Sequence, residues 1–233
     1  MEDVIIIKSL EQITLQMCDF HRIYPNIELI NESDAEVRLR GSFTLHKEYG
    51  CFQVLDDYEI EIVIPIASPK LPYVIDVQKH INPDYQHYYT DGKLCLETDV
   101  KIISDFVDGF DLLRWMDKYV ESYFFTYEYY MRFGEFPYGE RSHGLDGVLE
   151  SYQELLGAEN LQETYDIMRF ITTNCYRGHS LCPCQSGEKL RKCHGEKILP
   201  FYNYNVLYET IKNDENRITE AIKKRDKNKN KAK

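Results

Sequence analysis

Apolar and polar residues alternate along four stretches in the N-terminal third of the chain, and short turns separate these stretches. They are residues 27–30, 37–45, 58–64 and 73–77. Alternation with a period of two is typical of strands that bury one face. Because no helical pattern intervenes, consecutive strands are expected to pair as antiparallel neighbours. The pattern therefore predicts a four-stranded antiparallel meander with one face in contact with water.

Apolar residues recur at steps of three and four elsewhere, which predicts helices. The segments are residues 3–20, 109–133, 149–156, 161–173 and 199–224. The stripe within the second of these is rich in Phe and Tyr, which is typical of core packing rather than of a cofactor site. The order of elements predicts an α+β fold: an N-terminal helix, the meander, a long helix and a helical C-terminal appendage.

The chain carries a net charge of −11, although its last eleven residues contain seven Lys or Arg and one Asp. The remainder is thus more acidic than the total, which disfavours DNA or RNA as the main partner, and we interpret the basic tail as a solvated end. No apolar run approaches the roughly 20 residues of a transmembrane helix. The start of the chain is acidic, unlike a signal peptide. We expect a cytoplasmic protein with no DNA or membrane partner.

Three of the seven cysteines are clustered with a histidine near the C-terminus. Cys182 and Cys184 are one residue apart, and the adjacent pair Cys193 and His194 follows after eight residues. Three thiols and one imidazole match the number and kind of ligands in a structural tetrahedral zinc site. The alternative is four unrelated residues in one loop. The ligand-rich spacing favours Zn²⁺ over this alternative. The segment also has too few apolar residues to fold without help.

This segment, residues 182–195, resembles the SEC-C motif, the zinc knot at the C-terminus of the bacterial translocation ATPase and in many other bacterial proteins. The resemblance includes all four ligand positions. It implies a structural Zn²⁺ in a closed site, held by Cys182, Cys184, Cys193 and His194. It also implies that the knot docks on other proteins or on nucleic-acid assemblies.

Cys95 stands alone, directly after an Asp-Gly turn. Its neighbours Leu94 and Leu96 are apolar and are expected to anchor the backbone inward, which leaves the Cys95 side chain on the other face. A partly exposed cysteine fixed by a turn is a candidate nucleophile. The alternative is a small apolar packing residue, which is the commoner role of a free cysteine.

The context of Cys95 is a strand (58–64), a proline-rich turn (65–72), a second strand (73–77) and a loop that ends in Gly-Lys-Leu-Cys-Leu. This order resembles a ubiquitin-conjugating enzyme of the prokaryotic type. With the first helix, the meander and the long helix, the resemblance covers roughly residues 1–133. It implies that Cys95 carries a ubiquitin-like protein as a thioester and passes it to an amine of a protein target. It also implies a separate activating enzyme as partner.

Three further residues are candidates for catalytic roles. The family has a His-Pro-Asn triplet before its cysteine, and this chain has Asn-Pro-Asp at residues 82–84. Asn82 is the candidate donor to an oxyanion, and Asp84 the candidate group that orients or deprotonates the amine. His143, in a glycine-rich segment, is a candidate base. The alternatives are a simple turn at 82–84 and a histidine that caps a helix.

These patterns divide the chain into four segments. They are a domain similar to ubiquitin-conjugating enzymes (1–136), a helical linker region (137–178), the zinc knot (179–198), and a C-terminal helix with the basic tail (199–233). The leading function is a conjugating acyltransferase with a knot for partner docking. The alternative is a non-catalytic adaptor that uses the same fold and the knot to bind protein partners.

Overall fold

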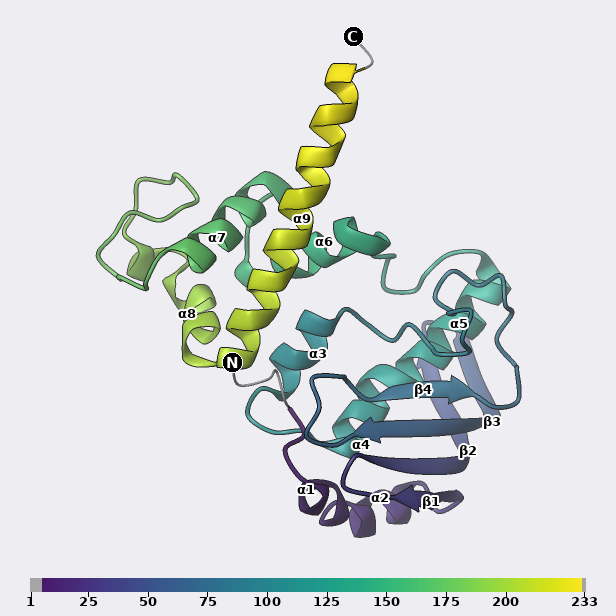
Figure 1. The fold of residues 1–233 in the computed structure, drawn as a ribbon. Coiled ribbons are helices and arrows are strands. Elements are labelled where there is room, and N and C mark those ends of the chain that lie inside the picture. The colour runs from purple at the N-terminus through teal and green to yellow at the C-terminus, as the bar shows by residue number, and fades with distance from the viewer. Residues whose placement is uncertain (1–5, 232–233) are drawn as a thin grey trace. The chain divides into compact units, whose positions relative to one another are not determined.

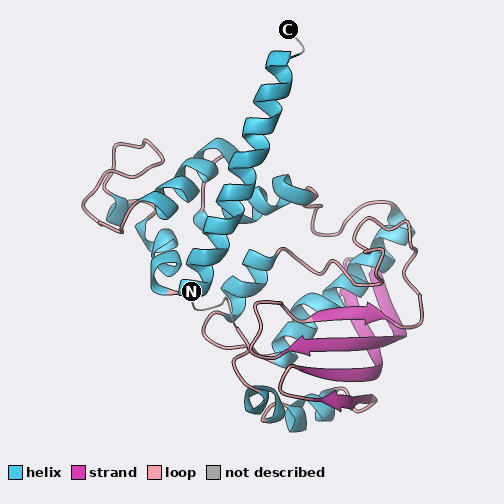
Figure 2. Cartoon of the chain, in the orientation of Figure 1, coloured by secondary structure: helices cyan, strands magenta, loops and turns pink. Residues whose placement is uncertain are grey.

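The structure, a computed structural model, describes residues 6–231 of the 233-residue chain. Its helices and its one four-stranded sheet give the α+β fold predicted from the sequence (Figure 2). The described residues form two compact units (Figure 1). The sheet unit comprises residues 6–97 with Asp108–Glu140, and the helical unit comprises Thr98–Val107 with residues 141–231.

The sheet unit is built on β1 (Ile27–Glu32), β2 (Glu36–Tyr49), β3 (Phe52–Pro65) and β4 (Tyr73–Asp76). The strands pair antiparallel in the order β1-β2-β3-β4, which confirms the predicted meander. In β2 the alternate residues Val37, Leu39, Phe43 and Leu45 are buried, as the period-two alternation requires. Both β2 and β3 extend beyond the predicted stretches, because their pairing continues to the tight turn after Tyr49.

A continuous helical run covers one face of this sheet (Figure 1). It consists of α4 (Leu112–Trp115), a π-helical turn η1 (Met116–Glu121) and α5 (Ser122–Phe133). The Phe124 ring lies 4.4 Å from that of Tyr58 and 5.5 Å from that of Phe43. The aromatic stripe is therefore core, as predicted. The π-helical turn is not apparent in the sequence pattern.

The prediction of one helix over residues 3–20 is wrong in its extent. Residues 3–5 lie outside the described part, and Ile6 and Ile7 are buried in non-helical backbone. The Ile7 carbonyl accepts a hydrogen bond from the Ala67 N–H at 3.0 Å. Two short helices follow, α1 (Leu10–Thr14) and α2 (Met17–Ile23). β-Branched isoleucines disfavour helix, and this long-range pairing holds them outside it.

The helical unit confirms the two predicted middle helices as α6 (Gly144–Leu156), which begins earlier than expected, and α7 (Leu161–Thr173). The predicted last helix is two helices, α8 (Gly195–Asn203) and α9 (Asn205–Lys231), with a break at Tyr204. Helix α3 (Asp99–Phe106) was not predicted. Among residues 6–231, no helix is both long enough and apolar enough to cross a bilayer. The unit also contains the short helical segment η2 (Leu190–Lys192).

Gly41 in β2 lies directly against the backbone of Asn26, and its replacement by alanine is expected to destabilise the sheet unit. A Cβ at this position would lie 1.8 Å from the Asn26 carbonyl oxygen. We expect Gly41→Ala to lower the free energy of unfolding by about 2–4 kcal/mol in urea titrations. Gly50→Ala is the control, because its Cβ would meet open space and the cost is about 1 kcal/mol of left-handed strain. Equal losses would contradict this explanation.

Candidate functional site

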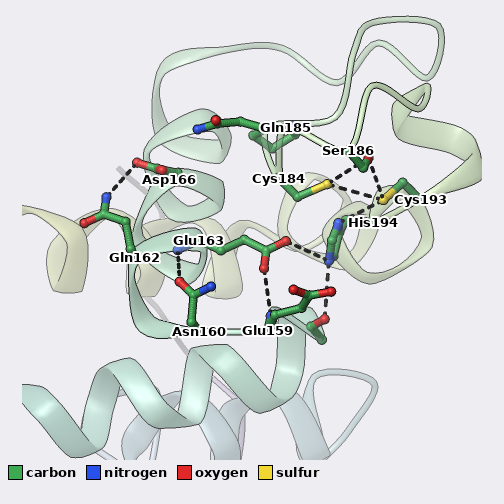
Figure 3. A pocket seen from close by; sticks show the side chains of 12 residues that line it. Glu159, Asn160, Gln162, Glu163, Asp166, Cys184, Gln185, Ser186, Cys193 and His194 are labelled. Atoms are coloured by element: carbon green, nitrogen blue, oxygen red, sulfur yellow. Dashed lines mark hydrogen bonds and ion pairs between the residues drawn. The ribbon is translucent and has the colours of Figure 1, made fainter.

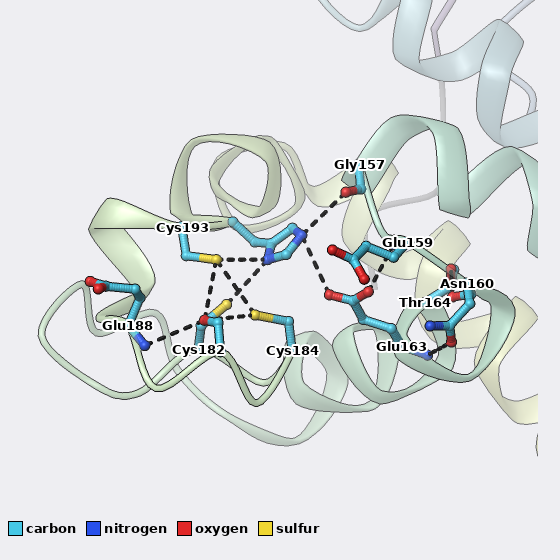
Figure 4. A network of polar contacts seen from close by, with 11 residues as sticks. Gly157, Glu159, Asn160, Glu163, Thr164, Cys182, Cys184, Glu188 and Cys193 are labelled. Carbon is cyan, nitrogen blue, oxygen red and sulfur yellow. Dashed lines mark hydrogen bonds and ion pairs between the residues drawn. The ribbon is translucent and has the colours of Figure 1, made fainter.

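The structure brings together the four predicted metal ligands in the helical unit (Figure 4). The Sγ atoms of Cys182 and Cys193 lie 3.3 and 3.2 Å from Nδ1 of His194. The Sγ atoms of Cys184 and Cys193 are 3.5 Å apart. All four donor atoms lie within 4.8 Å of one another. The cluster is therefore compact enough for one ion to contact every ligand.

A short loop after α7 shapes this cluster. The Cys182 N–H donates to the Glu188 carbonyl at 2.8 Å, so the first two cysteines sit on a closed hairpin. The turn of the hairpin uses left-handed backbone at Gln185 (φ +64°) and Gly187 (φ +79°). Leu190 is fully buried and anchors the return of the chain to the second ligand pair. We call residues 180–196 the knot.

The donor set fits Zn²⁺. Zinc–sulfur bonds of 2.3 Å in a tetrahedron place two sulfurs about 3.8 Å apart, and the donor distances in the knot are slightly shorter. Burial raises the pKa of the Cys182 thiol to about 12. Burial acts in the same direction on Cys184, but hydrogen bonds with Ser186 and the two neighbouring cysteines lower its pKa to about 6. A metal would hold all three as thiolates, and four protein donors fill a tetrahedral site.

The second ring nitrogen of His194 faces residues outside the knot, which the sequence did not indicate. Nε2 lies 3.3 Å from the Gly157 carbonyl oxygen and 3.8 Å from Oε1 of Glu163. Beside them is a pocket of about 480 Å³ between the knot and the first turns of α7 (Figure 3). Glu159, Glu163 and Asp166 line it. No motif links these residues to the cluster, because they are distant in sequence.

Comparison with known proteins supports the knot alone. Residues 180–196 match the family model of the SEC-C motif, a zinc-binding motif. The chain matches no curated protein and no solved structure. The matched motif and the compact cluster of Cys182, Cys184, Cys193 and His194 both fit metal binding in the helical unit. The resemblance of the sheet unit to ubiquitin-conjugating enzymes gains no support from these comparisons.

In the sheet unit, Cys95 lies on a small hairpin, residues 87–95, which we call the cysteine hairpin. Tyr88 pairs antiparallel with Leu94, and the Cys95 N–H donates to the His87 carbonyl at 2.9 Å. The turn closes with a hydrogen bond from the Gly92 N–H to the Tyr89 carbonyl at 2.9 Å. The return strand also pairs with β4, where the Leu94 N–H donates to the Val74 carbonyl at 3.0 Å.

This register decides which side chains accompany the thiol. Alternation puts His87, Tyr89, Lys93 and Cys95 on one face of the cysteine hairpin and Tyr88 and Leu94 on the other. Leu94 is 4% exposed, whereas Cys95 is half-buried. The Tyr89 Oη donates a hydrogen bond to the Cys95 Sγ at 3.2 Å. The thiol is therefore half-buried with the Tyr89 phenol beside it, an association that the sequence reasoning missed.

Tyrosines of α5 hold the loop that leads to the cysteine hairpin. The Tyr123 Oη donates to the His87 carbonyl at 2.9 Å, and the Asn82 N–H donates to the Tyr127 Oη at 3.0 Å. Burial raises the pKa of both tyrosines, so their hydroxyls keep their protons. At the other end, buried Asp76 accepts the Ile81 N–H at 2.7 Å. The loop is thus tied to the core at three points.

The other predicted catalytic residues occupy exposed positions. Asn82 and Asp84 lie in one turn, where the Asp84 N–H donates to Oδ1 of Asn82 at 2.9 Å. The turn alternative for residues 82–84 is therefore present in the structure. His143 belongs to the helical unit, at the N-cap position of α6, and its side chain makes no capping hydrogen bond.

Purified protein is expected to contain about one zinc per chain, because three thiols and an imidazole are held close enough together for one ion to contact all four. Cys184→Ser is expected to lose the metal, as measured by atomic emission. Cys175→Ser is the matched control, because Cys175 is exposed and lies outside the cluster. Chelation is expected to leave the sheet unit folded, since none of the four ligands belongs to it. Zinc retained by Cys184→Ser would contradict the assignment.

Proposed function

We propose that the protein is a conjugating acyltransferase that carries a ubiquitin-like protein as a thioester on Cys95. The observation that carries the proposal is the cysteine hairpin. It holds the thiol half-buried, with a hydrogen-bond donor 3.2 Å from its sulfur, at the edge of a four-stranded meander backed by α5. The proposal also uses the resemblance of the sequence to ubiquitin-conjugating enzymes, which implies this order of elements around the cysteine.

The proposed reaction has two steps. The Cys95 thiolate attacks the thioester carbonyl of a modifier bound to an activating enzyme; the new C–S bond forms and the activating enzyme's thiolate leaves. An amine of the target then attacks the Cys95 thioester. The C–N bond forms, the C–S bond breaks, the electron pair returns to the Cys95 sulfur, and the ammonium proton passes to water or to a base.

The surrounding residues have defined tasks in this scheme. The Tyr89 hydroxyl stabilises negative charge on the Cys95 sulfur, both as nucleophile and as leaving group. The Oδ1 of Asn82 is used by its turn, so its amide nitrogen is the end that donates to an oxyanion. Asp84 accepts from the incoming amine. His143, which belongs to the helical unit, is assigned no task in this scheme.

The zinc knot has a separate task. Four protein side chains converge in it, and four is the number of ligands in a structural tetrahedral zinc site. We propose a structural ion that orders the knot for docking on a protein partner. The proposed transfer chemistry requires only thiol, amine and proton transfers, so it places no demand on the zinc.

Cys95→Ala is expected to abolish a reductant-sensitive adduct formed with the activating enzyme, ATP and the ubiquitin-like protein. Cys95→Ser is expected either to abolish the adduct or to convert it to an ester that resists reducing agents, since an oxygen ester does not exchange with thiols. Non-reducing electrophoresis detects both outcomes. Cys51→Ser is the matched control, because Cys51 is exposed at the β2–β3 turn. An adduct that survives Cys95→Ala would refute the proposal.

Tyr89→Phe is expected to slow discharge of the thioester to an amine by roughly tenfold, the equivalent of one charge-assisted hydrogen bond. The measurement is a single-turnover decay of the isolated adduct. Tyr88→Phe is the control, because Tyr88 has the same chemistry on the opposite face of the cysteine hairpin. Equal rates for the two variants would remove Tyr89 from the mechanism without affecting the role of Cys95.

A second candidate function is a non-catalytic adaptor, and an exposed aromatic cluster favours it. Tyr49 at the β2–β3 turn has its ring 5.8 Å from Tyr129 and 5.3 Å from Tyr138. Phe133 is 49% and Tyr138 68% exposed, although large exposed aromatics are uncommon outside binding surfaces. If Cys95 carries no adduct, the sheet unit serves as a binding surface and the knot as a second contact.

A further inference from the structure

His194 links the ligand cluster to the turn between α6 and α7 through its two ring nitrogens. Nδ1 faces the thiols of Cys182 and Cys193. Nε2 faces the carbonyl of Gly157, which is the C-cap of α6, and the carboxylate of Glu163, in the first turn of α7. One imidazole therefore spans from the ligand cluster to the junction of two helices.

The Glu163 carboxylate is held in place by contacts other than His194. Its Oε2 accepts the Glu159 N–H at 2.8 Å, and its own N–H donates to Oδ1 of Asn160 at 3.0 Å. Together these bonds make a reciprocal cap at the start of α7. The Glu163 side chain is only 13% exposed. The negative charge facing Nε2 is thus fixed by the helix start.

We propose that Glu163 is a positioning residue for metal-bound His194 and that zinc occupancy thereby orders the α6–α7 turn. A metal on Nδ1 requires the neutral ring to carry its proton on Nε2. The Nε2–H group then donates a hydrogen bond to the Gly157 carbonyl oxygen, and its partial positive charge faces the Glu163 carboxylate. Without the metal the ring can take the other tautomer, in which Nε2 is an acceptor facing two acceptors.

The coupling extends to the pocket beside the knot. One wall of the pocket is formed by Cys184, Gln185 and Ser186, and the other by Glu163 and Asp166 on α7 (Figure 3). His194 contacts both walls, because its ring nitrogens face Cys193 of the knot and Glu163 of α7. Because coupling free energies are reciprocal, a turn that is ordered by zinc also makes zinc harder to remove. This predicts an effect of Glu163 on the metal and an effect of the metal on α7.

Glu163→Gln is the decisive variant, because glutamine still offers an oxygen to the Glu159 N–H but removes the charge that faces His194. We expect zinc release to 4-(2-pyridylazo)resorcinol to become about tenfold faster, the lower end of outer-shell effects, since the Gly157 carbonyl remains. Asp166→Asn, which lines the same pocket without contacting His194, is expected to stay within twofold of wild type. Glu163→Asp keeps the charge and is expected to retain zinc better than Glu163→Gln.

Hydrogen exchange of the amides in residues 157–164 tests the reverse effect. Removing zinc from the wild-type protein is expected to speed this exchange, and the metal-dependent difference is expected to shrink in Glu163→Gln. The two proteins are expected to exchange alike once stripped, because the cap survives the substitution. Zinc release at the wild-type rate would overturn the proposal. The proposal would also be overturned if Glu163→Gln exchanged faster than wild type by the same factor with and without zinc, because that result indicates a capping role only.

Discussion

The packing of α5 against the sheet determines the geometry of the sheet unit, because one helix face serves two purposes. Its aromatic rings fill the core, with Phe124 in contact with Tyr58 and Phe43. Its phenols extend from that core and hold the backbone of the loop before Cys95. The position of the thiol therefore depends on how α5 is seated, and a change in core packing would reach the cysteine hairpin without altering any residue on it.

The helical unit uses a different source of order at the knot. Few apolar side chains are available there, and Leu190 is the main buried anchor of the loop. In the structural role that we propose for zinc, the ion would supply the missing free energy, because binding fixes four side chains that the unfolded loop leaves free. The outer contacts of His194 then connect this local order to the helix ends around it.

Local signals made the strands and the zinc ligands predictable from the sequence. Each strand carries its own period-two alternation, and the spacing of the cysteines can be read within one loop, so neither signal depends on distant residues. Features that depend on distant partners were missed. Ile7 is kept out of a helix by Ala67, and Glu163 and Tyr123 act on residues far along the chain. Helix α3 had a usable signal, since Val100, Ile103 and Phe106 recur at steps of three and are buried.

The single tryptophan makes intrinsic fluorescence a probe of one of the two units. Trp115 lies in the sheet unit, fully buried against Phe110, and its indole N–H has no hydrogen-bond partner among the described residues. Its emission is therefore that of an indole in a dry, apolar environment and will shift to longer wavelength when the sheet unit opens. The helical unit contains no tryptophan, so the tryptophan emission of the intact protein reports on the sheet unit alone.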